Sequence, residues 1–390
     1  MISLALAGKP NAGKSTFFSA ATQTEVDIGN YPFTTIDANK GITHTRTTCP
    51  CQTRDIVCRN CQDGIRYVPV KLLDVAGLVP GAHEGRGLGN QFLDALTDAD
   101  AVLTVVDAAG NTNAEGEPVE TGEGDPFEEV DFVQSELQQW LTGIIQENWQ
   151  KVVRKSRSPS FDIDTALSEL MTGFGATESE IKGSLRAMSY PDNPQEWSQA
   201  NFKTLAIEVR KRSKPTVVVA NKADVADPAT LRQLNGMHTP LIPATASGEQ
   251  ALRNAAGQEL VSYHSGDSTF QIKGDISTHQ RSGLEKIKEL MNEYGGTGVQ
   301  SAINTAVYDV LDQITVYPVE NETQWTDTSG ETLPDAVLLT SGATPRDLAF
   351  AIHTDIGEGY LHAIDARTNR RIGEDTTLSE GDVIKIVSTA

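Results

Sequence analysis

The sequence predicts an α/β protein in which helices cover a mostly parallel sheet. Short apolar, β-branched runs recur in the first two thirds of the chain, with helical patterns between them. The third run ends at Val106 and the fourth begins only at Thr216, which is far more chain than one βα connection needs. After about Ser301 the pattern changes to short strands. We therefore expect a helical insert and a separate C-terminal module.

The expected strands of the sheet are bounded by Gly, Asp, Asn or Pro, and their continuous apolar character is typical of strands buried on both faces. They are Ile2–Ala7, Val68–Leu73, Ala101–Val106, Thr216–Ala220 and Leu241–Ile242.

The insert begins with an acidic segment, Asn111–Gly124, that we expect to be a flexible connection. Asp125 and Pro126 then predict an N-cap and the first helical position. Apolar residues follow at helical spacing, and a second helix is expected over Pro194–Arg212. The helical residues are Val130, Val133, Leu137, Trp140, Leu141, Ile144 and Ile145.

The C-terminal part reads as a small α+β module of four short strands and one helix. A helix should begin at Thr344, with Asp347 in place of the usual Glu of a capping box. The expected strands are Ile314–Val319, Ala336–Leu339, Tyr360–Ile364 and Val383–Val387.

The chain is strongly acidic, with 53 Asp and Glu against 32 Lys and Arg and a net charge of −21. Such a charge disfavours a broad nucleic-acid-binding face. Either the protein comes from a salt-adapted (halophilic) source, in which self-repulsion is screened, or it is simply acidic. No apolar run is long enough to span a membrane, and the segment Met1–Ala7 lacks the features of a signal peptide, so we expect a cytoplasmic protein.

The first expected strand runs directly into a phosphate-binding motif, G-x-x-x-x-G-K-[ST], over Gly8–Ser15. Backbone N–H groups would wrap the phosphates at a helix N-terminus. Lys14 would neutralise the β and γ phosphates, and the Ser15 hydroxyl would bind Mg²⁺. The expected nucleotide contacts here are Gly8, Pro10, Asn11, Ala12, Gly13, Lys14, Ser15 and Thr16.

Two further motifs follow strand ends. Asp74 and Gly77 form D-x-x-G, in which the Asp can hold the Mg²⁺ shell and the Gly can donate its N–H to the γ-phosphate. Asn221, Lys222 and Asp224 form N-K-x-D. The Asp224 carboxylate can accept two hydrogen bonds from guanine, and adenine offers neither donor. Thr245 and Ala246 are a looser match to a last base-contacting loop.

All four cysteines lie close together as Cys49-x-Cys51-x6-Cys58-x2-Cys61. Four thiolates can close a tetrahedral zinc site, and a cytosolic setting disfavours disulfides. Structural zinc and free or redox-active thiols are the two alternatives.

With these motifs the chain resembles the Obg-related P-loop GTPases, and most closely the YchF-type members of archaea. Asn30–Thr35 resembles their switch I, Asp74–Ala82 and Gly85–Asn90 their switch II, and the C-terminal module their TGS domain, a β-grasp fold. The resemblance implies a Ras-like G domain, a catalytic role for Lys14, Thr35 and Gly77, and Mg²⁺ bound by Ser15, Thr35 and Asp74. It also implies contact with the ribosome or RNA. The domain division expected from all of this is a G domain at 1–107 and 206–300 with a Cys-rich insertion at 42–66, a helical insertion domain at 108–205, and a TGS domain at 301–390.

Two departures keep alternatives open. Bacterial and eukaryotic YchF-type proteins lack N-K-x-D and prefer ATP, whereas this chain has the motif, so GTP is favoured and ATP is the rival. Leu78 stands where Ras-like enzymes have the water-orienting Gln. Hydrolysis should therefore be slow and use another group, such as a K⁺ ion held by Asn11. We expect a Mg²⁺-dependent, monomeric GTPase switch; an adaptor that binds nucleotide without hydrolysis is the third reading.

Overall fold

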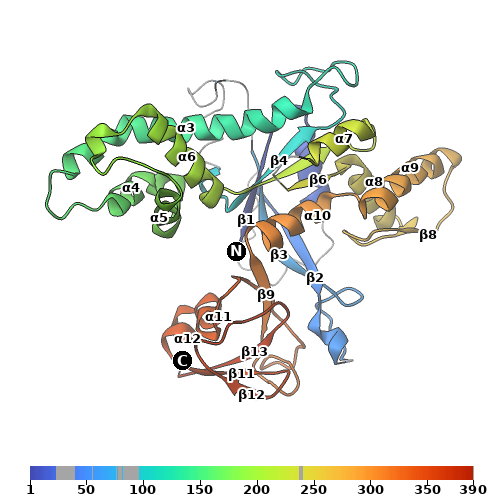
Figure 1. Cartoon of the computed structure of the whole chain (residues 1–390). Helices are drawn as coiled ribbons and strands as arrows, with labels where there is room; N and C mark the ends of the chain where they lie inside the picture. Colours follow the sequence, from blue (N-terminus) through green and yellow to red (C-terminus); the bar gives the residue numbers. More distant parts are fainter. Residues whose placement is uncertain are drawn as a thin grey trace.

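The computed structural model describes residues 1–22, 40–54, 56–75, 77, 81, 96–236 and 240–389. Its centre is a six-stranded sheet in the order β2-β3-β1-β4-β5-β6 (Figure 1). The strands are β1 (Ser3–Ala7), β2 (Lys40–Thr48), β3 (Ile65–Asp74), β4 (Ala101–Asp107), β5 (Thr216–Asn221) and β6 (Leu241–Pro243). Five of them run parallel, and β2 is antiparallel to β3. The mostly parallel α/β fold is thus confirmed.

Alternate residues of β1 point to opposite faces of the sheet, as strand geometry requires. Leu4 and Leu6 pack on one face with α1 (Lys14–Thr22), α8 (Ala246–Gly257) and α10 (Val299–Asn304), which a π-helical turn, Thr305–Val310, extends. Ala5 and Ala7 belong to the other face, which is covered by α3 (Pro126–Lys155). The helices α7 (Pro228–Leu234) and α9 (Thr278–Tyr294) complete that side.

Strand β2 was not predicted as a strand, since its segment was assigned to a Cys-rich insertion. It pairs with β3 over its whole length, from Lys40 opposite Leu73 to Thr48 opposite Ile65. The two strands form a long hairpin, and a short 3₁₀ turn, Pro50–Thr53, lies at its tip (Figure 1).

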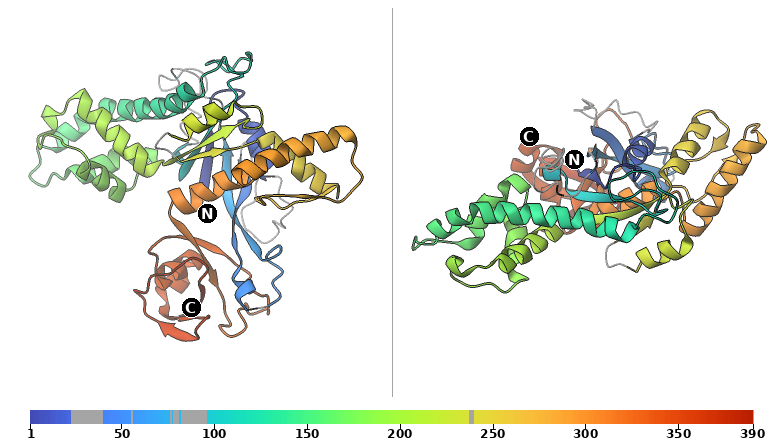
Figure 2. Two further views of the ribbon diagram at one scale, coloured as in Figure 1. Left: turned by 45° about the vertical axis from the view of Figure 1, so that its right-hand side comes forward. Right: turned by 90° about the horizontal axis from the view of Figure 1, so that it is seen from above.

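The helical insert projects from one side of the sheet (Figures 1 and 2). It consists of α3, α4 (Ile163–Met171), α5 (Glu178–Arg186) and α6 (Gln199–Ser213), with 3₁₀ turns at Thr172–Phe174 and Pro194–Glu196. Asp125 caps α3 as predicted, accepting from Phe127 N at 2.8 Å and Glu128 N at 3.3 Å. The helix has 30 residues, so its first half packs on the sheet and its second half lies in the core of the projection.

A second sheet, in the order β10-β9-β13-β11-β12, forms the C-terminal module. Its strands are β9 (Gln313–Pro318), β10 (Val337–Thr340), β11 (Tyr360–Asp365), β12 (Arg370–Ile372) and β13 (Val383–Ser388). Two helices, α11 (Pro345–Ile352) and α12 (Thr354–Glu358), accompany them. Thr344 and Asp347 form the predicted capping box at α11. Strand β12 and helix α12 were not predicted.

A two-stranded sheet of β7 (Val261–Ser262) and β8 (Gln271–Ile272) lies beside α8 and α9 (Figure 1). None of the helices in the described ranges is both long enough and apolar enough to span a bilayer. The domain limit placed between residues 205 and 206 falls inside α6, and the one between 300 and 301 falls inside α10.

Candidate functional site

The loop between β1 and α1 follows a path that requires glycine at two positions. Gly8 and Gly13 have φ of 147° and 101°. A Cβ at Gly8 would lie 2.3 Å from the Val105 carbonyl oxygen, and one at Gly13 would lie 2.1 Å from Asn221 Nδ2. These contacts are impossible for a side chain, so the glycines allow the loop to sit tightly on β4 and β5.

Lys14 and Ser15 begin α1 on this loop. The buried Lys14 ammonium donates to the carbonyl oxygens of Gly8 at 3.0 Å and Lys9 at 2.8 Å. The Ser15 hydroxyl donates to Asp74 Oδ2 at 3.0 Å. Burial lowers the pKa of Lys14 to about 8, although the nearby carboxylates of Asp74 and Glu129 raise it. The loop therefore brings together the hydroxyl and carboxylate that the sequence predicted as metal ligands.

The N-K-x-D segment is tied to this loop by one side chain. Asn221 Nδ2 donates to the Ala12 carbonyl oxygen at 3.0 Å, and Asn221 Oδ1 accepts from Ala246 N at 3.1 Å. Asn221 thus joins three of the predicted nucleotide-contacting loops. Asp224 is exposed beside it, and Thr245 caps α8 by accepting from Gly248 N at 3.1 Å.

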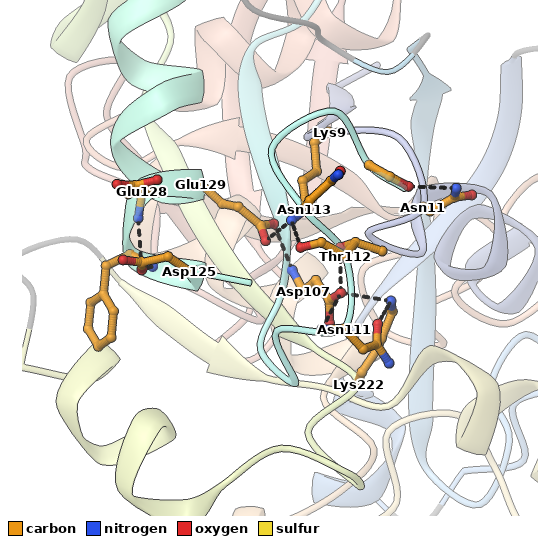
Figure 3. A network of polar contacts seen from close by, with 12 residues as sticks. Lys9, Asn11, Asp107, Asn111, Thr112, Asn113, Asp125, Glu128, Glu129 and Lys222 are labelled. Atoms are coloured by element: carbon orange, nitrogen blue, oxygen red, sulfur yellow. Dashed lines mark hydrogen bonds and ion pairs between the residues drawn. The ribbon is translucent and has the colours of Figure 1, made fainter. Parts of the chain in front are cut away.

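Sequence reasoning missed a buried polar network under the loop (Figure 3). Lys9 Nζ lies 2.5 Å from Glu129 Oε1 and donates to the Thr112 carbonyl oxygen at 2.7 Å. Glu129 Oε2 accepts from Asp107 N at 2.9 Å, and Asp107 Oδ2 accepts from Lys222 Nζ at 3.0 Å. Burial raises the pKa of Glu129 to about 7 in spite of Lys9. The network connects the phosphate loop, β4, α3 and the N-K-x-D segment.

A signal for this network existed in the sequence. Asp107 ends a buried apolar strand, as Asp74 does, and Glu129 adjoins the apolar face of α3. On the same side of that helix, seven residues further on, Glu136 Oε1 accepts from Gly81 N at 2.9 Å. Helix α3 therefore contacts both the phosphate loop and the segment that follows D-x-x-G.

The acidic segment Asn111–Gly124 is not a loose connection, which corrects our expectation. It folds back on itself, with Val119 N donating to the Asn111 carbonyl oxygen at 3.0 Å. It also lies on the phosphate loop, because Asn11 Nδ2 donates to the Gly116 carbonyl oxygen at 2.9 Å (Figure 3). A Cβ at Gly116 would lie 2.6 Å from the Pro10 carbonyl oxygen, so glycine is needed there.

The four cysteines gather at the tip of the β2–β3 hairpin, and their sulfur atoms all lie within 4.8 Å of one another. Cys49 Sγ is 4.0 Å from Cys58 Sγ, and Cys51 Sγ is 3.5 Å from Cys61 Sγ. The hydrogen bond from Cys49 is the largest of the effects that lower the pKa of Cys58, to about 5. Zn–S bonds of ~2.3 Å imply sulfur separations of ~3.8 Å, so this cluster fits one tetrahedral ion.

The cysteine cluster also packs against the C-terminal module. Cys49 and Cys51 share a buried apolar cluster with Tyr317 and Trp325. The Arg66 guanidinium donates to the carbonyl oxygens of Leu333 at 2.9 Å and Pro334 at 2.8 Å. The C-terminal module therefore packs against the tip of the β2–β3 hairpin.

Several predicted residues lie outside the described part of the chain. They are Thr35 with the switch I segment, and Leu78 and Gly85–Asn90 of switch II. Gly77 is described, and a Cβ on it would lie 2.9 Å from Pro10 Cγ.

Three family models match the chain. The 50S ribosome-binding GTPase model matches residues 3–141, the G4 motif-containing domain of the Obg-like YGR210-like GTPases matches 219–321, and the TGS domain matches 330–388. The sequence is 44% identical over 397 residues to a GTP-binding protein of Methanocaldococcus jannaschii, with 100% of both chains covered.

A solved structure of a GTP-binding protein from Pyrococcus horikoshii matches with a TM-score of 0.79 and 35% identity over 100% of both chains. The ribosome-binding ATPase YchF of Mycoplasma genitalium is 42% identical over 106 residues, which are 27% of this chain and 28% of that one. With the phosphate loop and the two further motifs in place on the expected fold, the chain belongs to the Obg-like YchF family of P-loop GTPases and carries a C-terminal TGS domain.

Proposed function

We propose that the protein is a Mg²⁺-dependent GTPase that hydrolyses slowly and acts as a nucleotide switch in association with the ribosome. The bridging position of Asn221 carries the proposal. Its hydrogen bonds to Ala12 and Ala246 hold the N-K-x-D segment against the phosphate loop. Asp224 is exposed in that segment. A carboxylate at this position would accept hydrogen bonds from a guanine base whose phosphates bind the loop.

The phosphate chemistry rests on the residues of the first two motifs. Lys14 would neutralise the β and γ phosphates, and Gly77 would donate its N–H to the γ-phosphate. The hydrogen bond between Ser15 and Asp74 supports a shared Mg²⁺ site, to which Thr35 would add a ligand. The bound Mg²⁺ would neutralise charge on the phosphate oxygens.

We also propose that a K⁺ ion beside the phosphates supplies part of the charge stabilisation that Leu78 cannot. Asn11 is exposed, and its Nδ2 is held by Gly116, which leaves Oδ1 to face a cation. Phosphate release measured in KCl and in NaCl separates this proposal from an adaptor that binds nucleotide without hydrolysing it.

Competition between GTP and ATP tests the proposed function most directly. In Mg²⁺ and concentrated KCl, we expect GTP to bind ~100-fold or more tightly than ATP, because ~2.7 kcal/mol is within what two lost buried hydrogen bonds cost. Equal affinities, or a preference for ATP, would replace the GTPase by an ATPase with relaxed base recognition.

The affinity for GTP should fall as the pH rises above about 8. The pKa of Lys14 is lowered to about 8 by burial, and triphosphate binding would raise it again. Binding above pH 8 must therefore take up a proton, which costs ~10-fold in affinity per pH unit. A Lys14→Arg variant stays charged and should lack this slope, although the nucleotide's own titration remains. Equal pH slopes in titration calorimetry of both proteins would contradict this assignment.

Zinc is proposed for the cluster of Cys49, Cys51, Cys58 and Cys61, where it would crosslink the hairpin tip that holds the TGS domain. Protein purified without chelator should contain one equivalent of zinc per chain, measured by plasma emission spectrometry. A Cys49→Ser/Cys58→Ser variant is the control and should contain almost none. Less than half an equivalent in the fresh parent protein would leave free or redox-active thiols as the alternative.

The partner is proposed from relatives. The Mycoplasma genitalium protein is called a ribosome-binding ATPase, and one matching family model is that of a 50S ribosome-binding GTPase. We extend ribosome or RNA association to this chain, together with a cytoplasmic location, a monomeric state and a salt-adapted source. The domain division at residues 107/108, 205/206 and 300/301 belongs to the same proposal.

A further inference from the structure

The loop that follows β6, Thr245–Ser247, is held from two sides. On the side of the phosphate loop, Asn221 Oδ1 accepts from Ala246 N. On the other side, Thr245 N donates to the Thr297 carbonyl oxygen at 2.8 Å. Asn221 belongs to the N-K-x-D motif, whereas Thr297 lies in a distant segment of the chain, outside all of the nucleotide-binding motifs. Whatever fixes Thr297 therefore also fixes the loop.

Thr297 is fixed by the glycines on either side of it and by one carboxylate. Gly296 and Gly298 have φ of 153° and 85°. A Cβ at Gly298 would lie 2.0 Å from the Pro243 carbonyl oxygen, so this turn lies directly on the end of β6. The buried Thr297 hydroxyl donates to Glu249 Oε2. Thr297 thus binds the loop through its backbone and Glu249 through its side chain.

Glu249 lies in the first turn of α8 and is fully buried. Its Oε2 accepts from the hydroxyl of Tyr263 at 2.6 Å as well as from that of Thr297. Its Oε1 accepts from Ser265 Oγ at 3.0 Å and from Arg253 Nε at 2.7 Å. Burial, and then the Glu249 carboxylate, raise the pKa of Tyr263 well above its usual value, so the Tyr263 hydroxyl keeps its proton and donates. Donors on both oxygens give the carboxylate one fixed position.

The stability of α8 does not by itself explain this network. Burying a carboxylate costs free energy, and a well-packed apolar replacement of a buried ion pair is often neutral or stabilising. A fully satisfied polar network does, however, make its surroundings rigid. The surroundings here include the Thr245 N–H and the loop backbone next to it. Groups that recognise a ligand must be held to within about 0.5 Å of the productive geometry.

We propose that Glu249 and Thr297 are positioning residues for guanine recognition. They act through the loop and not by touching the nucleotide: they hold Thr245–Ser247 where its backbone can contact a base that Asp224 also binds. This inference deepens the proposed function and rests on the preference for GTP over ATP proposed there.

Three single variants of the full chain test the positioning role. Thr297→Val removes the hydroxyl that donates to Glu249 but keeps the side-chain shape and the backbone carbonyl. Thr297→Ser keeps the hydroxyl. Ser265→Ala is the matched control, because it removes a hydroxyl from the other oxygen of the same carboxylate. The Ser265 carbonyl oxygen accepts from Arg46 and Tyr67, away from the loop. Competition binding in Mg²⁺ and concentrated KCl measures GTP and ATP affinity, and circular dichroism measures folding and thermal unfolding.

We expect Thr297→Val to bind GTP ~5-fold or more weakly than the parent, which is the effect of losing about one hydrogen bond. Its ATP affinity should stay within ~2-fold, because the phosphate loop is unchanged. Thr297→Ser should restore the GTP affinity of the parent. Ser265→Ala should also keep that affinity, although it lowers the unfolding temperature as Thr297→Val does.

Two results would make the network merely structural and overturn the positioning role. One is an unchanged GTP affinity in Thr297→Val, or an equal fall in its GTP and ATP affinities. The other is a loss of GTP affinity in Ser265→Ala as large as in Thr297→Val. Either result in a chain that prefers GTP leaves the proposed function intact. A parent chain without a preference for GTP would overturn the proposed function and the positioning role together.

Discussion

Replacing Glu129 by leucine should lower the free energy of unfolding by ~3–5 kcal/mol, because it leaves the Lys9 ammonium buried without its partner. The side chains of Lys9 and Glu129 are only 2% and 6% exposed. The carboxylate also accepts from Asp107 N, so its loss leaves a buried N–H without an acceptor. Urea unfolding, followed by circular dichroism, measures the change.

Glu128→Leu is a closely matched control. Glu128 is the neighbour of Glu129 in the first turn of α3, so both variants lose the same interaction with the helix dipole, but Glu128 is exposed. We expect Glu128→Leu to lower the free energy of unfolding by no more than ~1 kcal/mol.

A double variant, Lys9→Met/Glu129→Leu, separates the charge from the packing. It should be more stable than Glu129→Leu alone, since no buried ammonium remains, but less stable than the parent by ~1–3 kcal/mol for the unpaired Asp107 N–H. If Glu129→Leu and Glu128→Leu lower the free energy of unfolding equally, the buried Lys9–Glu129 pair does not hold the phosphate loop to α3.

The sequence was informative where local chemistry determines the structure. The phosphate loop, the cap at Asp125 and the capping box at Thr344 each depend on residues within a few positions of one another. The continuous apolar strands β1, β4 and β5 could be recognised because strands buried on both faces need no partner to be identified. The short spacing of the four cysteines between Cys49 and Cys61 similarly indicated a cluster. In the structure their sulfur atoms all lie within 4.8 Å of one another.

The rest depends on contacts between distant segments. Strand β2 reads as a polar segment, KGITHTRTT, and becomes a strand only through its register with β3. The position of Glu129 against Lys9 joins residues 120 positions apart, and each alone looks like an ordinary surface charge. The acidic segment Asn111–Gly124 was expected to be flexible, because nothing within the segment indicates its contacts. They are made with Lys9 and Asn11 of the phosphate loop, which lies far away in the sequence.

Replacing Asp224 by alanine should weaken GTP binding by on the order of 100-fold and leave ATP binding unchanged within ~3-fold. The carboxylate would accept from the guanine N1–H and 2-amino groups, and hydrogen bonds to a charged acceptor contribute ~1.5–3 kcal/mol each. Asp224 is exposed, and its carboxylate makes no hydrogen bond within the part of the chain that the structure describes. Its removal should therefore leave the stability of the protein unaltered. Competition binding and thermal unfolding measure the two effects.

Inosine triphosphate makes the test sharper, because it lacks the 2-amino group and keeps the N1–H. The parent should prefer GTP over this nucleotide by ~10-fold, which is the contribution of one hydrogen bond to a carboxylate. In Asp224→Ala the preference should disappear, since neither nucleotide then meets the acceptor. A preference that persists would mean that another group reads the 2-amino position. Loss of GTP and ATP binding together would mean that Asp224 shapes the loop instead of contacting the base.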